Sequence, residues 1–287
     1  MSGPLPKLGI LAGSGPLPRR LVEACRAQAR PFFVIAFEGE TEPAFVEDTA
    51  HRWVGLGAVG TVLQILKAQG CAEVTLCGPV KRPDLSRLGL DWRGVKLMGR
   101  ILRLAAQGDD ALLRAVIGEL EKHGFRVIGC ETVLAALLAP EGPLGALAPD
   151  AAARRDIALG IETAAALGRE DKGQAAVVRA GAVLKVEDQR GTDALLADIA
   201  APDDGRRSGV LVKVMKPQQD SRADLPAIGP QTVRGAARAG LEGIAVEAER
   251  TFVIERAQVA ALANENGLFV VGVRVREREG EGEGEGR

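Results

Sequence analysis

Hydrophobic and polar positions follow two alternating patterns along the first half of the chain. Short apolar runs of the kind that form buried strands recur between longer segments with helical periodicity. The predicted strands are residues 8–12, 32–36, 74–77 and 125–129. The predicted helices are residues 17–29, 60–69 and 112–122. Strands that alternate with helices predict an α/β domain with a parallel, Rossmann-like sheet.

The pattern changes after a segment rich in proline and glycine. Residues 139–149 lack periodicity and are typical of a linker. Beyond them, a helix over 152–167 precedes short strands at 175–179, 182–186, 209–214, 244–246 and 251–254, with a further helix near 233–239. We therefore predict a Rossmann-like N-terminal domain over 1–138 and a mixed α+β C-terminal domain over 139–275. The Glu-Gly tail, 276–287, cannot bury enough apolar surface to fold.

Composition narrows the class of protein. The 287 residues are 46% hydrophobic and 26% charged, with a formal net charge of −1, as in a soluble globular protein. Aromatic residues make up only 3% and tyrosine is absent, which argues against nucleic-acid binding. The four cysteines form no CxxC pair, and no run of 18 apolar residues or signal peptide is evident. We therefore expect a cytoplasmic protein with reduced thiols.

A glycine-rich turn follows the first predicted strand. Gly13, Ser14 and Gly15 stand where a phosphate-binding turn would precede a helix. The dinucleotide fingerprint G-x-G-x-x-G would require glycine at position 18, where Pro18 stands. Pro16 and Pro18 also remove two backbone donors. A tight structural turn, or a turn that touches another kind of nucleotide, is favoured over NAD(P) binding.

A predicted basic amphipathic helix lies in the middle of the chain, over residues 92–104. Its cations, Arg93, Lys96, Arg100 and Arg103, recur at helical spacing beside apolar positions. They indicate either a solvated face or a surface for anionic or lipid-like ligands. Helix capping is one interpretation of the acidic pair that follows at 109–110, and a further role stays open.

Polar residues gather in the second domain, at 171–174, 187–193 and 213–232, mostly beyond predicted strand ends. His51 and His123 have no metal-ligand spacing, and neither G-x-S-x-G nor a P-loop motif occurs. The remaining carboxylates, lysines and arginines suit a hard cation and a phosphoryl group. These residues indicate Mg²⁺-assisted phosphoryl or nucleotidyl chemistry.

Several long strings in these regions resemble a single family. They are GDDALL at 108–113, DKGQAAVV at 171–178, VEDQRGTDALL at 186–196 and VKVMKPQQDSRADLPAIGPQT at 212–232. The opening LGILAGSGPLP and the segment CGPVKRPDL at 77–85 fit the same pattern. Over about residues 7–273 the chain resembles the LpxI family of UDP-2,3-diacylglucosamine pyrophosphatases.

The resemblance implies a reaction in lipid A biosynthesis. Members hydrolyse the diphosphate of UDP-2,3-diacylglucosamine to UMP and 2,3-diacylglucosamine 1-phosphate (lipid X), with water attacking the α-phosphorus. They require Mg²⁺ and hold the lipid substrate between two domains. The family string K-P-x-Q-D-x-R-x-D-x-P corresponds here to Lys216, Pro217, Gln219, Asp220, Arg222, Asp224 and Pro226. Lys172 departs from the valine that is frequent in the family's D-V-G-Q.

Residue roles follow as hypotheses. Asp224 is the expected catalytic carboxylate, either as a metal ligand or as the group that orients water, with Asp193 and Asp220 as further metal ligands. The cations Lys213, Lys216 and Arg222 are expected to stabilise the diphosphate. The expected substrate-binding residues are Gln174, Thr192 and Gln219, together with Gly13, Ser14 and Gly15.

Two other functions remain open at this point. An NAD(P) oxidoreductase would bind nicotinamide and be indifferent to Mg²⁺. A non-catalytic nucleotide-sugar or lipid-binding protein would bind the substrate without releasing UMP. The residues also leave open a homodimer and peripheral contact with the inner membrane surface. The interdomain cleft, together with the 92–104 helix, is the expected site for the acyl chains of the substrate.

Overall fold

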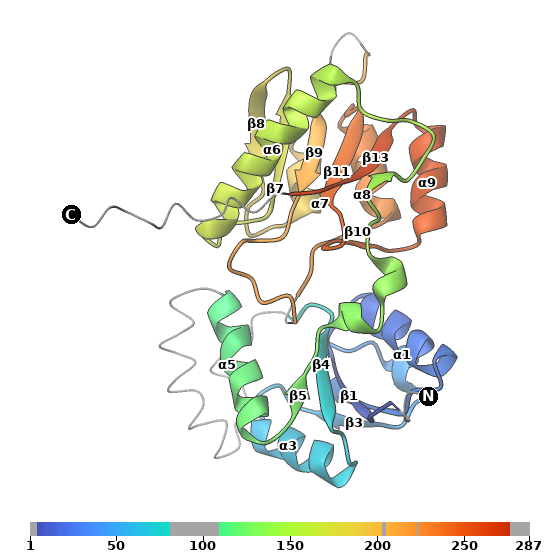
Figure 1. Ribbon diagram of the computed structural model, residues 1–287, viewed down its shortest axis with the longest axis vertical. Helices are drawn as coiled ribbons and strands as arrows, with labels where there is room; N and C mark the ends of the chain where they lie inside the picture. The colour runs from blue at the N-terminus through green and yellow to red at the C-terminus, as the bar shows by residue number, and fades with distance from the viewer. Residues whose placement is uncertain (1–4, 81–108, 203–204, 223, 276–287) are drawn as a thin grey trace, which may run out of the picture. The chain divides into compact units, whose positions relative to one another are not determined.

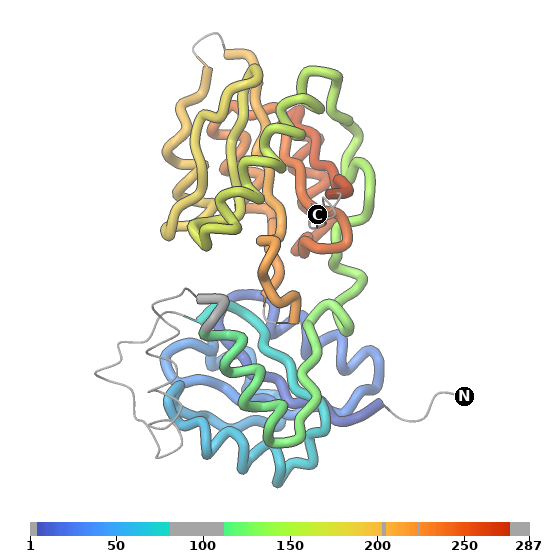
Figure 2. The backbone as a smooth tube through the Cα atoms, turned by 60° about the vertical axis from the view of Figure 1, so that its left-hand side comes forward, coloured from blue at the N-terminus to red at the C-terminus, as the bar shows by residue number. Residues whose placement is uncertain are grey.

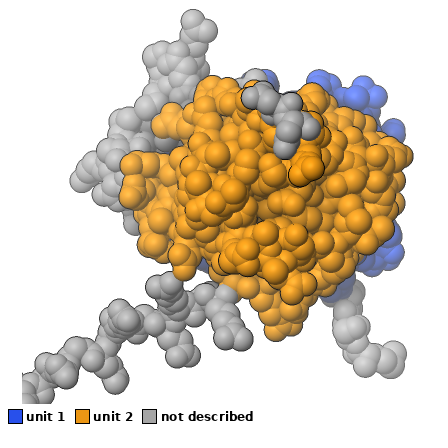
Figure 3. Space-filling model, turned by 90° about the horizontal axis from the view of Figure 1, so that it is seen from above, with its two compact units in different colours: residues 1–137, 218–225 blue, residues 138–217, 226–287 orange. Residues whose placement is uncertain are grey.

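The chain divides into two compact units in the computed structural model, which describes residues 5–80, 109–202, 205–222 and 224–275. Unit 1 comprises residues 1–137 and 218–225, and unit 2 comprises residues 138–217 and 226–287 (Figure 3). The backbone therefore returns to unit 1 after Pro217 and leaves it again after Leu225 (Figure 2). The hydrophobic pattern does not predict this return, because these eight residues are mostly polar.

Unit 1 is an α/β domain built on a parallel sheet, as the sequence predicts (Figure 1). Its elements are β1 (Leu8–Ala12), α1 (Leu17–Ala27), β2 (Phe32–Phe37), α2 (Pro43–Val46), β3 (His51–Val54), α3 (Val59–Ala68), β4 (Glu73–Cys77), α5 (Asp109–Lys122), β5 (Arg126–Val127) and the 3₁₀ turns η1 (Cys130–Thr132) and η2 (Ala135–Leu137). The strand order is β3-β2-β1-β4-β5. This order reverses between β1 and β4, which makes that junction the topological switch point of the sheet.

The strands of unit 1 are buried on both faces, which explains their continuous apolar runs. One face packs against α3 and α5 through a core that includes Leu11, Ile35, Leu63 and Ile117. Helix α1 buries Leu21, Val22 and Cys25. All four cysteines are buried and free of disulfides, as the sequence predicts.

Unit 2 is a mixed α+β domain. Its elements are β6 (Gly142–Pro143), α6 (Ala151–Arg169), β7 (Ala175–Arg179), β8 (Ala182–Val186), α7 (Thr192–Ala197), β9 (Val210–Lys213), β10 (Ala227–Ile228), α8 (Pro230–Arg238), β11 (Gly243–Glu247), β12 (Phe252–Val253), α9 (Arg256–Glu265) and β13 (Phe269–Val273). The main sheet has the order β6-β13-β11-β9-β7-β8, and β10 pairs with β12 separately. In the main sheet, β9, β11 and β13 are parallel, and β7 runs antiparallel to β8 and β9.

Helices cover both faces of the main sheet of unit 2. Alternate residues of β9 face opposite sides, so that Val212 packs with α6 residues while Leu211 packs with α7, α8 and α9. The predicted linker is not free of structure, because Gly142–Pro143 forms the edge strand β6. The Leu144 amide also donates to the carbonyl of Val270.

Two predicted features lie outside the described residues. They are the basic helix over 92–104, with its cations, and the Glu-Gly tail over 276–287. Among the residues that the structure describes, no helix combines the length and the apolar character that crossing a bilayer requires.

Candidate active site

The carboxyl-end edge of the main sheet in unit 2 collects polar residues from several strands. Because β7 runs against β9, Ala175 pairs with Lys213, and Gln174 therefore lies beside the end of β9. Glu187 follows the end of β8, and Glu247 ends β11. Loops at the carboxyl ends of parallel strands are the usual place for a ligand site in such sheets.

Lys213 is the central cation of this edge, with only 8% of its surface exposed. Its ammonium donates to Thr192 Oγ1 at 2.9 Å and to the carbonyl of Ala227 at 3.2 Å. The Thr192 hydroxyl donates to Glu187 Oε1 at 2.5 Å, and the backbone amide of Gln174 donates to Glu187 Oε2 at 2.8 Å. Three predicted site residues, Gln174, Thr192 and Lys213, are therefore brought together around Glu187.

A second cation, Lys216, lies in the loop after β9. Its ammonium forms an ion pair with Asp171 that is mostly shielded from solvent. The loop passes close to the end of α6, where a Cβ on Gly168 would lie 3.2 Å from the Lys216 Cα. Glu247 fixes the same loop by accepting a hydrogen bond from the Met215 amide at 2.9 Å. Asp193, a predicted metal ligand, is exposed in the first turn of α7.

The glycine-rich turn of unit 1 lies at the switch point between β1 and β4. The Gly13 amide donates to the Cys77 carbonyl, and both the amide and the hydroxyl of Ser14 donate to the Pro79 carbonyl. A Cβ on Gly13 would lie 2.5 Å from the carbonyl oxygens of Gly78 and Pro79. These two amides are occupied within the protein, which favours the structural-turn interpretation. Substrate contact by Gly13, Ser14 and Gly15 stays a prediction.

The returning segment 218–225 carries a strong ion pair in unit 1. Both carboxylate oxygens of Asp220 accept hydrogen bonds from the Arg222 guanidinium, and Oδ1 also accepts from the Arg222 amide at 3.0 Å. These bonds lower the pKa of Asp220. Arg222 also pairs with Glu121 of α5 at 2.7 Å. The backbone carbonyl of Gln218 accepts from Arg114, also of α5. Contacts with α5 therefore anchor this segment in unit 1.

Two predicted residues in this segment have different surroundings. Asp224 is exposed. A hydrogen bond with Cys130 and burial raise the pKa of the Cys77 thiol, and the charge of Asp224 raises it further. Cys77 is the last residue of β4, at the switch point of the sheet. Gln219 is buried, and its Oε1 has no hydrogen-bond partner among the described residues.

Glu131 in the η1 turn adds an unpredicted carboxyl group to unit 1. Burial raises its pKa, and the nearby charge of Asp220 raises it further, although its own amide counteracts them. Its Oε2 is buried without a partner in the described part of the chain. The carboxyl group folds back over Gly129, where an added Cβ would meet it in a clash. Glu131 is therefore a half-buried acid whose pKa depends in part on the segment 218–225.

The predicted metal ligands are divided between the two units. Asp193 belongs to unit 2, whereas Asp220 and Asp224 belong to unit 1. Across residues 5–80, 109–202, 205–222 and 224–275, no group of three or more histidine, cysteine or acidic side chains could hold a metal ion. The oxygen chemistry suits Mg²⁺, but a closed all-protein cage is not present in these ranges.

Comparisons with known proteins identify the family. The family model for the LpxI N-terminal domain matches residues 7–137, and that for the LpxI C-terminal domain matches residues 140–271. The UDP-2,3-diacylglucosamine pyrophosphatase LpxI of Caulobacter vibrioides is 43% identical over 273 residues, which cover 93% of this chain and 97% of the relative. The chain belongs to the LpxI family.

A solved structure gives only a distant likeness to this LpxI family member. It is N5-carboxyaminoimidazole synthase from Aspergillus clavatus in complex with ADP and 5-aminoimidazole ribonucleotide. Identity is 12%, the match covers 65% of this chain and 42% of that chain, and the TM-score is 0.24.

Sequence reasoning missed the carboxylates that hold the predicted residues in place. Glu187 and Asp171 lie inside the polar strings that suggested the family, but nothing in the strings separates a buried acid from a solvated one. The sequence could have identified Glu187 only by its position, which lies immediately after a strand and shortly before the helix that begins at Thr192. Glu121 and Glu131 leave no signal, because they meet the segment 218–225 only in three dimensions.

Proposed function

We propose that this protein hydrolyses UDP-2,3-diacylglucosamine to UMP and lipid X in lipid A biosynthesis. The observation that carries the proposal is the 43% identity to a UDP-2,3-diacylglucosamine pyrophosphatase over 97% of that relative's length. In the reaction, water oxygen forms a bond to the α-phosphorus while the bond from that phosphorus to the bridging oxygen breaks. The water oxygen remains on UMP, and the sugar 1-phosphate leaves.

The cations at the edge of unit 2 support this chemistry. Hydrolysis of a diphosphate depends on positioning and on neutralising phosphate charge. Lys213 is held by Thr192 and by a backbone carbonyl, and Lys216 is held by Asp171. Groups fixed in this way need little reorganisation when they meet an anion, so we assign both lysines to the diphosphate.

In unit 1, Asp224 is our proposed catalytic carboxylate. Its exposure leaves it accessible to water and substrate, and its charge contributes to the raised pKa of the Cys77 thiol at the end of β4. Arg222 is already paired with Asp220 and Glu121. We propose that Arg222 contacts the diphosphate. We also propose that Gln219, whose Oε1 has no partner within the part of the chain that the structure describes, accepts a hydrogen bond from substrate.

We propose that the reaction requires Mg²⁺. This ion is usually bound through one or two carboxylates together with substrate phosphates, and it keeps several waters. Such binding needs no group of three protein carboxylates. Asp224 and Asp193 are exposed candidates, and Asp220, whose oxygens accept hydrogen bonds from Arg222, is the third. When bound, Mg²⁺ would neutralise negative charge on the diphosphate.

The deciding experiment measures UMP release from UDP-2,3-diacylglucosamine with Mg²⁺ and with EDTA. We expect Mg²⁺-dependent release by the wild-type protein and a loss on the order of 10²-fold or more in Asp224→Ala. Asp188→Asn is the matched control, because Asp188 is an exposed acid outside the assigned site. If Asp224→Ala still releases UMP at the wild-type rate, the proposed reaction stands and the catalytic role of Asp224 is rejected. No release by folded wild-type protein with any divalent metal would reject the reaction and favour a binding protein.

We also propose a cytoplasmic location with peripheral contact with the inner membrane, because the substrate carries two acyl chains. Cosedimentation with anionic vesicles, with and without charge reversal at Arg100 and Arg103, tests this contact. A homodimer is a further proposal, which sedimentation equilibrium tests directly.

A further inference from the structure

Glu187 is a buried acid to which the proposed reaction assigns no role. Only 6% of its surface is exposed, and its two oxygens accept hydrogen bonds from the Thr192 hydroxyl and the backbone amide of Gln174. Removing a carboxylate from water is unfavourable unless hydrogen bonds and opposite charge compensate. Its position is therefore maintained by the contacts it makes.

The contacts form a continuous chain that ends at a proposed catalytic cation. Thr192 has one hydroxyl hydrogen, which it donates to Glu187 at 2.5 Å. The lone pairs of the Thr192 oxygen are then available to accept from the Lys213 ammonium at 2.9 Å. Glu187 thus sets the direction of the Thr192 hydroxyl, and Thr192 sets the position of Lys213. The carboxylate also places a negative charge one hydroxyl away from the buried ammonium.

We propose that Glu187 is a positioning residue that acts through Thr192 to fix Lys213 for the diphosphate. The inference rests on the proposed function and adds a specific requirement to it. Because Glu187 also accepts from the Gln174 amide, one carboxylate aligns the start of β7, the start of α7 and the end of β9. An amide at position 187 replaces one of the two accepting oxygens with an NH2 donor, so one of the two hydrogen bonds loses its acceptor.

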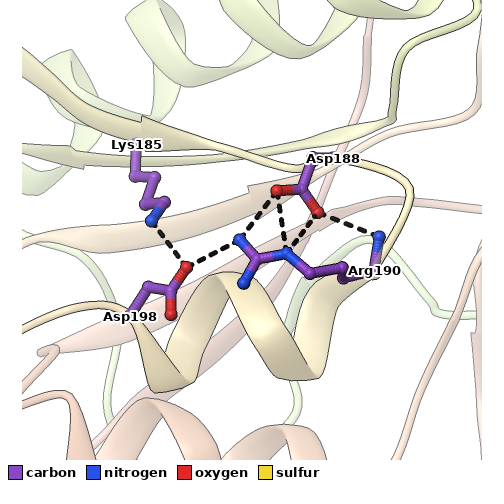
Figure 4. Close-up of polar contacts among 4 residues, drawn as sticks. All are labelled: Lys185, Asp188, Arg190 and Asp198. Atoms are coloured by element: carbon purple, nitrogen blue, oxygen red, sulfur yellow. Dashed lines mark hydrogen bonds and ion pairs between the residues drawn. The ribbon is translucent and has the colours of Figure 1, made fainter.

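The next residue supplies a matched control. Asp188 lies in the same loop, but its carboxylate is exposed and binds Arg190 at 2.7 Å. Arg190 and Lys185 also bind Asp198, which gives the surface network of Figure 4. Asp188→Asn therefore removes one carboxylate charge from the same loop without touching Thr192 or Lys213. Exposed networks of this kind contribute little to stability.

The experiment compares UMP release by Glu187→Gln, Thr192→Val, the double variant and Asp188→Asn, with Mg²⁺ present. A misplacement of about 1 Å in a site can cost on the order of 10²-fold. We expect kcat losses of about ten- to hundredfold in each of the first two variants, with less change in KM. Asp188→Asn should stay within about twofold of the wild type. Far-UV circular dichroism checks that each variant is folded.

The double variant separates positioning from a general loss of structure. If Glu187 acts through Thr192, the double variant is no slower than the slower single variant, because residues of one network are not additive. Thr192→Ser, which restores the hydroxyl, should be at least about tenfold faster than Thr192→Val. Multiplicative losses in the double variant, or equal rates in the serine and valine variants, would overturn the inference. Wild-type protein that releases no UMP would instead reject the proposed function.

Discussion

Gly160 of α6 offers a sharp test of how the helix places the strand that ends in Lys213. A Cβ on Gly160 would lie 2.3 Å from Val212 Cγ2 and 2.8 Å from Val212 Cβ. Carbon atoms pack at about 3.5–4.0 Å, so Gly160→Ala forces α6 and β9 apart by roughly 1 Å. Overpacking costs about 1–3 kcal/mol, and the better helix propensity of alanine returns about 1 kcal/mol. Since the clash includes a branched Cβ, we expect a net loss of about 1–2 kcal/mol.

The loss should appear in urea unfolding followed by far-UV circular dichroism, which reports on both units. Trp53 lies in unit 1, and residues 138–217 and 226–287 contain no tryptophan, so tryptophan fluorescence does not report on unit 2. Val212→Ala removes the closest contact and should recover part of the loss in the Gly160→Ala background. UMP release should fall as well, because Val212 precedes Lys213. A Gly160→Ala protein as stable as the wild type would refute the packing argument.

Three further predictions concern the free energy of unfolding. Glu131→Gln should raise the free energy of unfolding at pH 7, because burial raises the pKa of Glu131 and disfavours its charged form. Urea titrations should show that this gain vanishes as the pH falls below the ordinary glutamate range. Asp220→Asn should lower the free energy of unfolding by about 0.5–1 kcal/mol at pH 7, because Arg222 lowers the pKa of Asp220. In urea denaturation at low pH, the difference between variant and wild type should disappear, because the wild type loses the ion pair. Asp156→Asn should cost about 1.5–3 kcal/mol in thermal unfolding. The two oxygens of the buried carboxylate accept from the backbone amides of Ala180 and Gly181, and asparagine replaces one of these oxygens with an NH2 donor.

The regular elements were predictable because their periodicity follows from burial. The strands at 8–12 and 32–36 are continuous apolar runs, as strands covered on both faces must be. The strand at 51–54 was missed because His51, Arg52 and Trp53 interrupt its apolar character at the edge of the sheet. The edge strand β6 was missed for a related reason, since its two residues are glycine and proline.

The site was predictable as a set of residues but not as an arrangement. The string from Lys216 to Asp224 is continuous in sequence, yet the structure assigns Lys216 to unit 2 and Asp220, Arg222 and Asp224 to unit 1. The local sequence does not predict this division, because the division depends on which helix the segment contacts in the folded chain. Here α5 binds the segment, because Arg114 donates to the backbone carbonyl of Gln218 and Glu121 forms an ion pair with Arg222.

The contrast between Glu187 and Asp188 shows why the remaining information is three-dimensional. The two acids are adjacent and chemically alike, and both follow an edge strand whose first three residues are exposed. That strand has too weak an alternation to say which acid turns inward. The inward acid is selected by three partners that come from elsewhere in the chain, namely the Gln174 amide, the Thr192 hydroxyl and, through it, Lys213. In a buried polar network of this kind, each group needs the others as hydrogen-bond partners. The role of Glu187 can therefore be recognised only when the strand register shows that all of these groups lie at the same edge of the sheet.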